Sequence, residues 1–317
     1  MNELLFSLNV IIPLFLCCLT GYVMRRLEYI GESFAQDCSG VVFYIAIPCN
    51  IFISIVEHDF RAGFDGGLVA FVMVACTAIA FLSTVICRKV ISNTRTAATV
   101  AHNIFRGNFT LLGIPLATSL LGKEGAVVML LLVPFGILCS NIYSVLILSV
   151  INPLEEVAAV STIRKAVQKV ITNPMTIASV LGIAISFSQL HLPTLIISPI
   201  DSFSQMSSGL ALFMLGAQLK GVNLLKDWQY TAATVILRLV IIPLMVLLPA
   251  VLMGFRGNPL AVLLIFFASP TAVTCYIMAD NMGGDQELSV SAVLATSCLS
   301  TITLTLGIFL LKSMRLI

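Results

Sequence analysis

The sequence is poor in charge. Charged side chains make up 10% of its 317 residues and hydrophobic side chains 59%, whereas soluble domains carry about 25% charged residues. A soluble protein with so few charges would expose large apolar patches and aggregate. A soluble globular protein is therefore excluded, and a lipid bilayer is the expected solvent.

Common enzyme motifs are also missing. The chain has no phosphate-binding loop, Gly-x-Ser-x-Gly or His-Glu-x-x-His motif, which argues against hydrolases and against ATP as a direct energy source. His58, His102 and His191 are isolated, and the nine cysteines form no Cys-x-x-Cys pair. Asp285 follows two glycines, as in membrane aspartyl proteases, but lacks a second intramembrane aspartate. We expect no enzyme, no metal and no cofactor.

Two further absences concern partners and targeting. The net charge is +2 and no run of Lys or Arg occurs, so no nucleic-acid partner is expected. The first residues carry no positively charged stretch, so no cleaved signal peptide is expected either. The first apolar segment should therefore remain as a membrane helix.

Apolar segments of the length needed to span a bilayer fill the chain. Such a helix needs about 20 mostly apolar residues. The segments lie near 5–24, 35–55, 66–87, 98–120, 125–149, 173–189, 197–219, 229–253, 259–280 and 288–311. The pattern predicts an all-α integral membrane protein of about ten transmembrane helices.

The basic residues predict the orientation. Loops after the odd-numbered segments carry about twice as many Lys and Arg residues as the loops on the opposite side, and cytoplasmic loops are the ones enriched in these residues. We therefore expect a multi-pass plasma membrane protein, in a bacterial inner membrane, with both termini outside the cytoplasm. The polar loop 151–171 is then a cytoplasmic linker.

That linker separates two five-helix units, 1–150 and 172–317. A five-helix unit that starts outside ends inside, so the second unit must start inside. Two units with one fold would then be inverted repeats, a common plan of secondary transporters.

Each unit has a proline inside its fourth apolar segment. Pro115 follows Gly113 and Ile114, and Pro270 lies between Ser269 and Thr271. Proline removes a helical N–H and clashes with the preceding turn. A broken helix at membrane depth is tolerated where it lines a cavity, and the N-terminal ends of half-helices attract anions. We predict two functional breaks, with a simple kink as the alternative.

At these residues the sequence resembles the auxin efflux carrier family, which includes plant PIN-type auxin carriers and bacterial malate or malonate permease-like proteins. The resemblance covers the whole chain and rests on motifs in order along it. These are Ile47-Pro48, Asn108 with Gly113 to Leu116, Ser208 to Gly216, Arg238 with Pro243, and Ala268 to Pro270 with Tyr276 to Ala279.

The resemblance implies a scaffold of helices 1, 2, 6 and 7, which forms homodimers, and a transport domain of helices 3–5 and 8–10. Helices 4 and 9 cross at their prolines, and the transport domain moves like an elevator. A substrate carboxylate binds beside the crossing. The implied site residues are Asn108, Gly113, Ile114, Pro115, Ser269, Pro270 and Thr271, faced by Asn50 and Ile51.

The chain also departs from the plant pattern. It lacks the long cytoplasmic loop, so regulation by kinases is not implied. Ile51 stands where the plant pattern has serine, so auxin is not the expected substrate. Asp280-Asn281 replaces a charged pair.

Charged residues inside the segments offer further roles. Arg238 lies mid-segment, where a charge is costly. It could neutralise a carboxylate substrate or brace helix-end carbonyls, and we favour the brace. For Arg106 we favour snorkelling toward the interface over attraction of the substrate. Asp280 and Asp37 are candidates for carrying a coupling proton, although Asp280 and Asp285 fit solvated helix caps better.

The favoured function is therefore a secondary carrier for a small organic anion such as a mono- or dicarboxylate. The alternative is a sodium- or proton-coupled carrier of the related bile-acid-symporter-like architecture, and a channel is less favoured because no ring of like charges occurs. Coupling to H⁺ or Na⁺ stays open, since neutral oxygens such as those of Thr110 and Thr274 could contribute to a sodium site.

Overall fold

Helices make up nearly all of the chain that can be described. The structure, a computed structural model, describes residues 16–57, 65–151, 168, 170–188, 190, 192–219 and 226–317. Within these ranges five helices are long and apolar enough to cross a membrane, and two shorter helices are also apolar. The chain is thus an integral membrane helical protein. Much of the first predicted segment, most of the 151–171 linker, His58 and His191 lie outside the described residues.

The first half follows the predicted segments closely. A helix over 16–26 precedes α2 (Glu32–Val41), the π-helix η1 (Val42–Ala46) and α3 (Ile47–Val56). They are followed by α4 (Gly66–Val90), α5 (Thr94–Phe105), the π-helix η2 (Phe109–Gly113) and α6 (Ile114–Ile151). Gly122 has a φ of 68° and interrupts α6, so α6 contains the end of the fourth segment and the whole fifth.

The second half consists of α8 (Pro174–Ser188), α9 (Thr194–Gln218), α10 (Trp228–Ile236), the π-helix η3 (Leu237–Ile241), α11 (Ile242–Leu252), α12 (Asn258–Ala268), α13 (Thr274–Asn281) and α14 (Gln286–Ser313). The α10–η3–α11 run forms one span, and α12 with α13 forms a broken one.

Each of the three π-helices ends directly before an Ile-Pro pair. The prolines are Pro48, Pro115 and Pro243. Because proline has no N–H, the carbonyl four residues earlier loses its helical partner. Widening the turn to i→i+5 hydrogen bonds lets that carbonyl reach the next N–H instead. At these three places proline therefore widens the helix without ending it.

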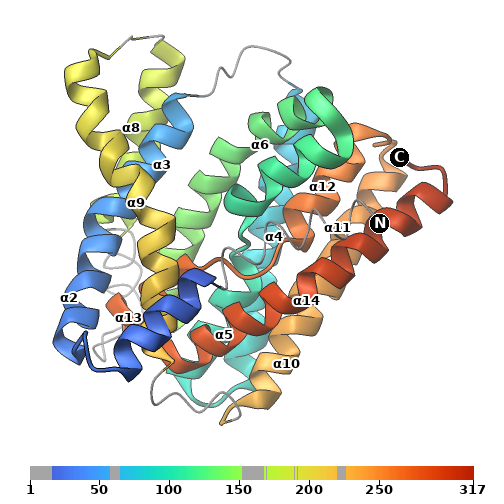
Figure 1. Ribbon diagram of the computed structural model, residues 1–317. Coiled ribbons are helices and arrows are strands. Elements are labelled where there is room, and N and C mark those ends of the chain that lie inside the picture. Colours follow the sequence, from blue (N-terminus) through green and yellow to red (C-terminus); the bar gives the residue numbers. More distant parts are fainter. Residues whose placement is uncertain are drawn as a thin grey trace.

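The helices form two groups (Figure 1). On the left lie α2, α3, α8 and α9, with α3 packed against both α8 and α9. The 16–26 helix packs on α9 so closely that a Cβ at Gly216 would overlap the carbonyl of Cys18. On the right, α4, α6, α10, α11 and α14 surround α5 and α12.

The half-helices α5 and α12 form the centre of the second group. Every residue of α5 from Thr96 to Phe105 is buried, as is every residue of α12 from Leu260 to Ala268. Helices buried on all sides belong to a protein interior and not to a lipid-facing surface. The outer helices instead expose Val74, Phe81, Leu248, Leu252, Ile302 and Phe309.

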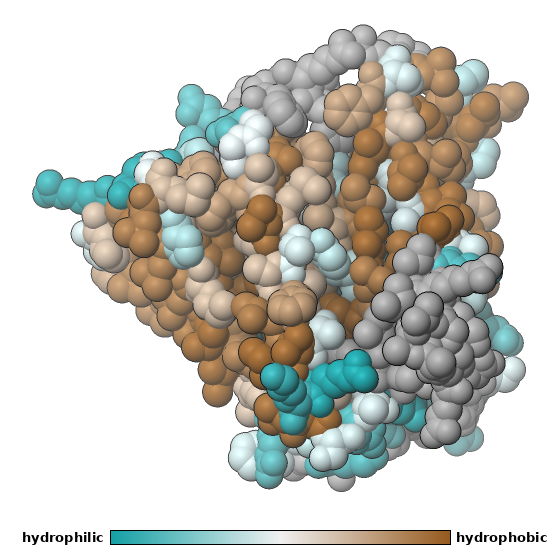
Figure 2. Space-filling model, turned by 180° about the vertical axis from the view of Figure 1, so that it is seen from behind, coloured by the Kyte–Doolittle hydropathy of each residue, from teal (hydrophilic) through white to brown (hydrophobic). Residues whose placement is uncertain are grey.

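The surface reflects this division. Figure 2 shows apolar side chains over most of one face, with hydrophilic ones gathered at its lower end and at one upper edge.

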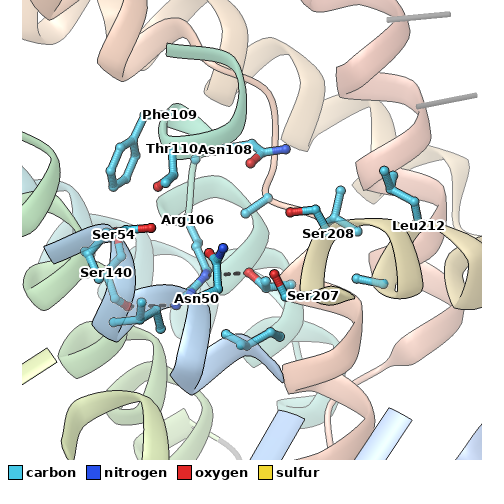
Figure 3. Close-up of a pocket in the computed structure, with 18 of the residues that line it drawn as sticks. Asn50, Ser54, Arg106, Asn108, Phe109, Thr110, Ser140, Ser207, Ser208 and Leu212 are labelled. Atoms are coloured by element: carbon cyan, nitrogen blue, oxygen red, sulfur yellow. Dashed lines mark hydrogen bonds between the residues drawn. The ribbon is translucent and has the colours of Figure 1, made fainter. Parts of the chain in front are cut away.

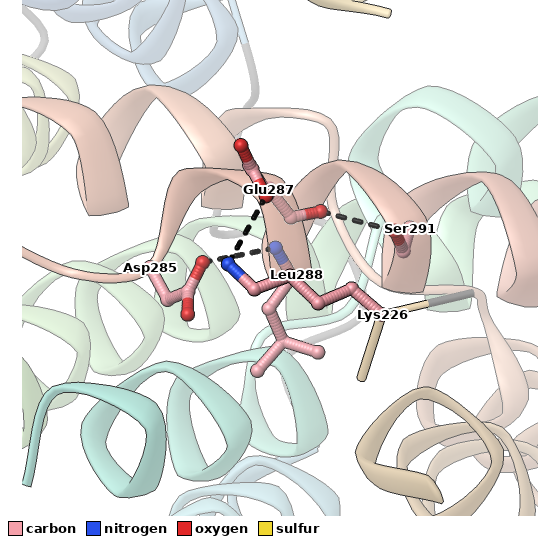
Figure 4. A network of polar contacts seen from close by, with 5 residues as sticks. All are labelled: Lys226, Asp285, Glu287, Leu288 and Ser291. Carbon is pink, nitrogen blue, oxygen red and sulfur yellow. Dashed lines mark hydrogen bonds and ion pairs between the residues drawn. The ribbon is translucent and has the colours of Figure 1, made fainter. Parts of the chain in front are cut away.

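At one end of the bundle Lys226 forms an ion pair with Glu287 at 3.6 Å, while Asp285 accepts a hydrogen bond from the Leu288 N–H at the start of α14 (Figure 4). Exposed pairs of this kind contribute at most about 1 kcal/mol, so they mark a helix end more than they stabilise it.

Candidate functional site

Two extended segments cross in the middle of the protein. Gly107, after α5, pairs in antiparallel fashion with Thr271, after α12. The Asn108 N–H donates to the Pro270 carbonyl at 2.8 Å, and the Ala272 N–H donates to the Arg106 carbonyl at 3.0 Å. Backbone groups freed by the helix ends thus satisfy each other, as buried polar groups must.

One of the two predicted breaks lies elsewhere in the segment. Pro270 lies in the second break as predicted, but the first break is at 106–108 and Pro115 lies within the helix that resumes afterwards. The prediction of a break at Pro115 was therefore wrong. The wider turn of η2 lets the carbonyl that Pro115 leaves without a partner accept from the next N–H, so the helix continues. Gly107 marks the true position, since a Cβ there would overlap the guanidinium of Arg238 and meet Ser269 Oγ at 2.8 Å.

Arg238 braces the crossing from one side. Its side chain is 2% exposed. Nε donates to the Ser269 carbonyl at 2.9 Å, and Nη1 donates to the carbonyls of Ile104 and Phe105 at 3.3 and 3.0 Å. These carbonyls end α12 and α5, where helix dipoles leave negative partial charge. The arrangement is the helix-end brace favoured from the sequence.

Arg106 lies on the other side of the crossing. Its side chain is 7% exposed, so the expectation that it snorkels to the interface was wrong. Its Nε donates to Thr274 Oγ1 at 2.9 Å, and Nη1 to the Ser140 carbonyl and Ser144 Oγ at 3.3 and 3.1 Å. Nη2 donates to Asn141 Oδ1 at 3.0 Å. Polar groups on α6 and α13 therefore hold the guanidinium inside the protein.

The guanidinium keeps one unused donor. Arginine has five N–H groups, and the four hydrogen bonds just described leave one N–H on Nη2 without a protein acceptor among the described residues. Within the same part of the chain no carboxylate forms an ion pair with Arg106. A buried cation without a counter-ion is costly, so this position favours an anion from outside the chain.

A cavity of about 360 Å³ lies beside Arg106 (Figure 3). The crossing, α3, α6 and α9 all contribute to its wall. The lining residues are Ile47, Asn50, Ile51, Ser54, Glu57, Arg106, Gly107, Asn108, Phe109, Thr110, Ile137, Ser140, Ser207, Ser208, Ala211, Leu212, Ala272, Val273 and Thr274.

Two helix starts border this cavity. Phe109 and Thr110 begin η2, and Val273 and Thr274 begin α13. The first N–H groups of a helix have no intrahelical acceptor and carry partial positive charge. Together with Arg106 they make this end of the cavity positive, which suits a carboxylate or another small anion.

The cavity opens toward one end of the bundle. Ile47, Asn50, Ser54 and Glu57 line it at the spacing of one face of α3, up to the exposed end of that helix. α4 begins shortly after that end, is 25 residues long and carries Arg88 and Lys89 in its last turn. The mouth of the cavity therefore lies at the end of the bundle opposite the basic end of α4.

α13, which begins at the cavity, contacts the first helix group. Tyr276 Oη on α13 donates to the Ala211 carbonyl on α9 at 2.6 Å, and Ser39 Oγ on α2 donates to Asp280 Oδ2 at 2.9 Å. Asn281 Nδ2 also donates to Ser39 at 3.3 Å. These contacts join α13 to the first helix group.

The structure brings together part of the predicted site. Asn108, Asn50 and Ile51 line the cavity. Ser269 and Thr271 lie behind the crossing, where Ser269 Oγ donates to the Phe266 carbonyl and Thr271 Oγ1 to the Asn103 carbonyl. Gly113 and Pro270 are not among the described lining residues, and the side chains of Ile114 and Pro115 lie outside what the structure describes.

The candidate coupling residues lie away from the cavity. Asp280 contacts Ser39, Asp285 caps α14, and Asp37 is exposed and accepts from Ser33 Oγ at 3.4 Å. His102 is fully buried on α5, and neither ring nitrogen has a hydrogen-bond partner within the described ranges.

Sequence reasoning missed the residues that hold Arg106. Ser140, Asn141 and Ser144 lie on one turn of α6, and Thr274 begins α13. A buried arginine requires acceptors, and small polar side chains at i and i+4 in an apolar helix are a signal that could have identified them.

Comparison with known proteins agrees with a transport role. A family model described as "Membrane transport protein" matches residues 6–308. A curated relative from Methanothermobacter thermautotrophicus, named "Uncharacterized transporter", is 26% identical over 315 residues, which cover 95% of this chain and 97% of the relative. Both matches include the crossing and all of the cavity wall.

Proposed function

Because the chain belongs to the membrane transport protein family, the family of the auxin efflux carriers, we propose that it is a secondary carrier that moves a small organic anion by alternating access. As a member of this family it is a transporter and not an enzyme.

The unused N–H of Arg106 is the observation that carries the proposal. It lies at a cavity beside two helix starts, and the guanidinium has no counter-ion among the described residues. A carboxylate there would accept a charge-assisted hydrogen bond, typically about 1.5–3 kcal/mol. It would also neutralise a buried cation, so the site favours binding of an anion over a neutral or cationic solute.

Alternating access is supported by the asymmetry of the cavity. The mouth lies at the end of α3, while Tyr276 and Ser39 form contacts between α13 and the first helix group, to which we assign closure of the opposite side. With the basic helix ends in the cytoplasm, this conformation faces outward and both termini lie outside. The plasma membrane of a bacterium is the proposed location.

The two helix groups suggest how the closed side opens. We assign the 16–26 helix, α2, α3, α8 and α9 to a scaffold, through which two copies associate, and α4–α6 with α10–α14 to a transport domain. An elevator-like shift of the transport domain would break the α13 contacts to Ala211 and Ser39 and carry the crossing, with its bound anion, past the scaffold. The ten-helix, inverted-repeat plan is part of this proposal.

Flux into proteoliposomes tests the function. Short mono- and dicarboxylates would be offered while pH, sodium and voltage gradients are varied separately, which also identifies the coupling ion. We expect saturable uptake that is lost in Asn108→Ala and Arg106→Gln. Arg88→Gln removes the same charge from an exposed position and should leave uptake intact. Absence of carboxylate flux under every gradient, with folded protein, would refute the proposal.

A further inference from the structure

The cavity has one positive end. Among the described residues that line it, Arg106 is the one cation and Glu57 the one carboxylate. Glu57 follows the end of α3 and is exposed at the mouth. A ligand held by Arg106 therefore finds no second guanidinium or ammonium in the described wall, and it has a negative charge ahead of it on the way in.

The rest of the wall offers neutral hydrogen-bonding groups. Ser54 on α3 and Ser208 on α9 are partly exposed to the cavity, and neither hydroxyl forms a hydrogen bond within the described part of the protein. The same holds for the amide of Asn108 and the hydroxyl of Thr110. Figure 3 shows Ser54 and Ser208 around the space that Asn108 and Arg106 also border. Unused hydroxyls thus lie on opposite sides of the space that Arg106 borders.

These free groups differ from their neighbours. Asn50 Nδ2 donates to Ser204 Oγ at 3.2 Å, and Ser207 Oγ donates to the Ser204 carbonyl at 2.7 Å. Their hydrogen-bonding capacity is at least partly used by the protein itself. Ser54 and Ser208 keep theirs for a ligand.

Aromatic surface contributes little to the wall. Phe109 is the one aromatic residue among the described lining residues, and it is 3% exposed. Its ring stacks on Phe266 with centroids 4.1 Å apart. The ring face is therefore already covered, and the cavity has no free aromatic platform for a large planar acid.

From this distribution of charge and hydroxyls we infer that the substrate is a hydroxy-monocarboxylate, a small acid with a single negative charge and at least one hydroxyl group. This inference rests on the proposed function and narrows it. The carboxylate binds at Arg106 and the helix starts, and the hydroxyl group exchanges hydrogen bonds with Ser54 and Ser208. A second carboxylate would lose its hydration without gaining a cation, and Glu57 repels it at the mouth.

A site of this kind should prefer an acid with a hydroxyl group and an acid with a single negative charge. A site that hydrogen-bonds a substrate hydroxyl discriminates against the analogue that lacks it, because its own polar groups are then left unpaired. A site with one cation likewise discriminates against the dianion. Glycerate should therefore be transported better than both propionate, which lacks the hydroxyls, and malonate, which carries two carboxylates.

Uptake of these three acids into proteoliposomes at neutral pH tests both preferences. We expect the glycerate-to-propionate ratio of kcat/KM in the wild type to be about fivefold or more, the effect of one to two ordinary hydrogen bonds. In Ser54→Ala and Ser208→Ala this ratio should fall toward one. Ser202→Ala, on an exposed face of α9 outside the cavity, should keep it. Ser208→Thr retains a hydroxyl and should preserve part of the preference if the alanine variant folds poorly.

Glu57 allows a second test, of the preference for a single negative charge. Glu57→Gln should raise malonate uptake relative to glycerate by about fivefold, since it removes a negative charge at the mouth. A wild type that prefers malonate, or that transports propionate and glycerate equally, would overturn the inference and leave the anion carrier intact. Failure to transport any of the three acids or other carboxylates, with folded protein, would refute the proposed function itself.

Discussion

Two buried arginines flank the crossing, and they differ in what they contact. Arg238 donates to three backbone carbonyls at the ends of α5 and α12 and, at 3.4 Å, to Ser269 Oγ, beside a space of only about 10 Å³. Arg106 donates to three side chains and one carbonyl, beside a cavity of about 360 Å³. Arg238 thus has no room beside it for a ligand, whereas Arg106 borders the proposed substrate site.

The difference shows how a buried charge can be interpreted. Sequence places both arginines in apolar segments and makes both functional candidates. Their hydrogen-bond acceptors separate the roles. Backbone carbonyls at helix ends have no alternative partner, so a cation that satisfies them is structural. Side-chain hydroxyls and amides can rotate, so a cation that they hold can also engage a substrate.

The largest effect is expected at Arg238. Arg238→Gln leaves carbonyls of Ile104, Phe105 and Ser269 without donors, and each buried unsatisfied group costs about 1–3 kcal/mol. We expect a loss of about 3 kcal/mol or more, seen as a strongly lowered melting temperature and poor recovery in detergent. A variant with the melting temperature of the wild type would contradict the role of Arg238 as a brace.

Gly107→Ala tests the same contact from the other side. Its Cβ would overlap the Arg238 guanidinium, and overpacking of this kind costs about 1–3 kcal/mol. Gly40→Ala in α2 is the matched control, because nothing lies within 4 Å of a Cβ there. Alanine in a helix should stabilise that position by about 0.5–1 kcal/mol. Equal melting temperatures of the two variants would contradict the packing argument.

Arg106→Gln should impair uptake more than it lowers the melting temperature, the opposite of what is expected for Arg238→Gln. Loss of a charge-assisted hydrogen bond to the substrate, about 1.5–3 kcal/mol, lowers kcat/KM for uptake by about 10- to 100-fold. The melting temperature should fall much less than in Arg238→Gln, because Ser144 and Asn141 can find other partners. Uptake in proteoliposomes and melting temperature in detergent would be measured on the same preparations of both variants. Equal losses of uptake and of melting temperature in the two variants would contradict the comparison.

A smaller effect is expected at Asn141. Its Oδ1 accepts from Arg106, and its Nδ2 donates to Ser179 Oγ on α8 at 2.9 Å. Asn141→Ala should let the guanidinium move and raise KM for the anion about fivefold, the value of one hydrogen bond of about 1 kcal/mol. An unchanged KM would mean that Thr274 and Ser144 position Arg106 without help.

The smallest effect is expected at Pro115. Pro115 lies in a continuous helix after η2 and not in the break. Pro115→Ala should therefore change uptake by less than about threefold, because the crossing is made by residues 106–108 and 270–272. Loss of transport in this variant would restore the first prediction of a break at Pro115.

The sequence was sufficient for the spans but not for the site. Apolar length and family resemblance predicted an integral membrane protein of helices, and Asn108, Asn50 and Ile51 do line one cavity. The position of the first break was missed because proline is a stronger local signal than Gly107, whose role depends on a contact 131 positions further along the chain with Arg238. Local propensity carries no information about such a contact.

Arg106 was misjudged for a related reason. Its place early in a segment suggested an exposed charge, whereas Ser140, Asn141 and Thr274 from other helices surround it. The lone hydroxyls of Ser54 and Ser208 were also missed. A serine in a membrane helix usually bonds to its own backbone, and only the structure shows that these two do not.

The most direct test of the account is a structure of the protein with its best-transported carboxylate bound. We predict that the carboxylate lies in the cavity between α3 and the crossing, within hydrogen-bonding distance of Arg106 Nη2 and of the first N–H of α13. A bound carboxylate elsewhere, with the Arg106 guanidinium still unengaged at saturating ligand, would contradict the account.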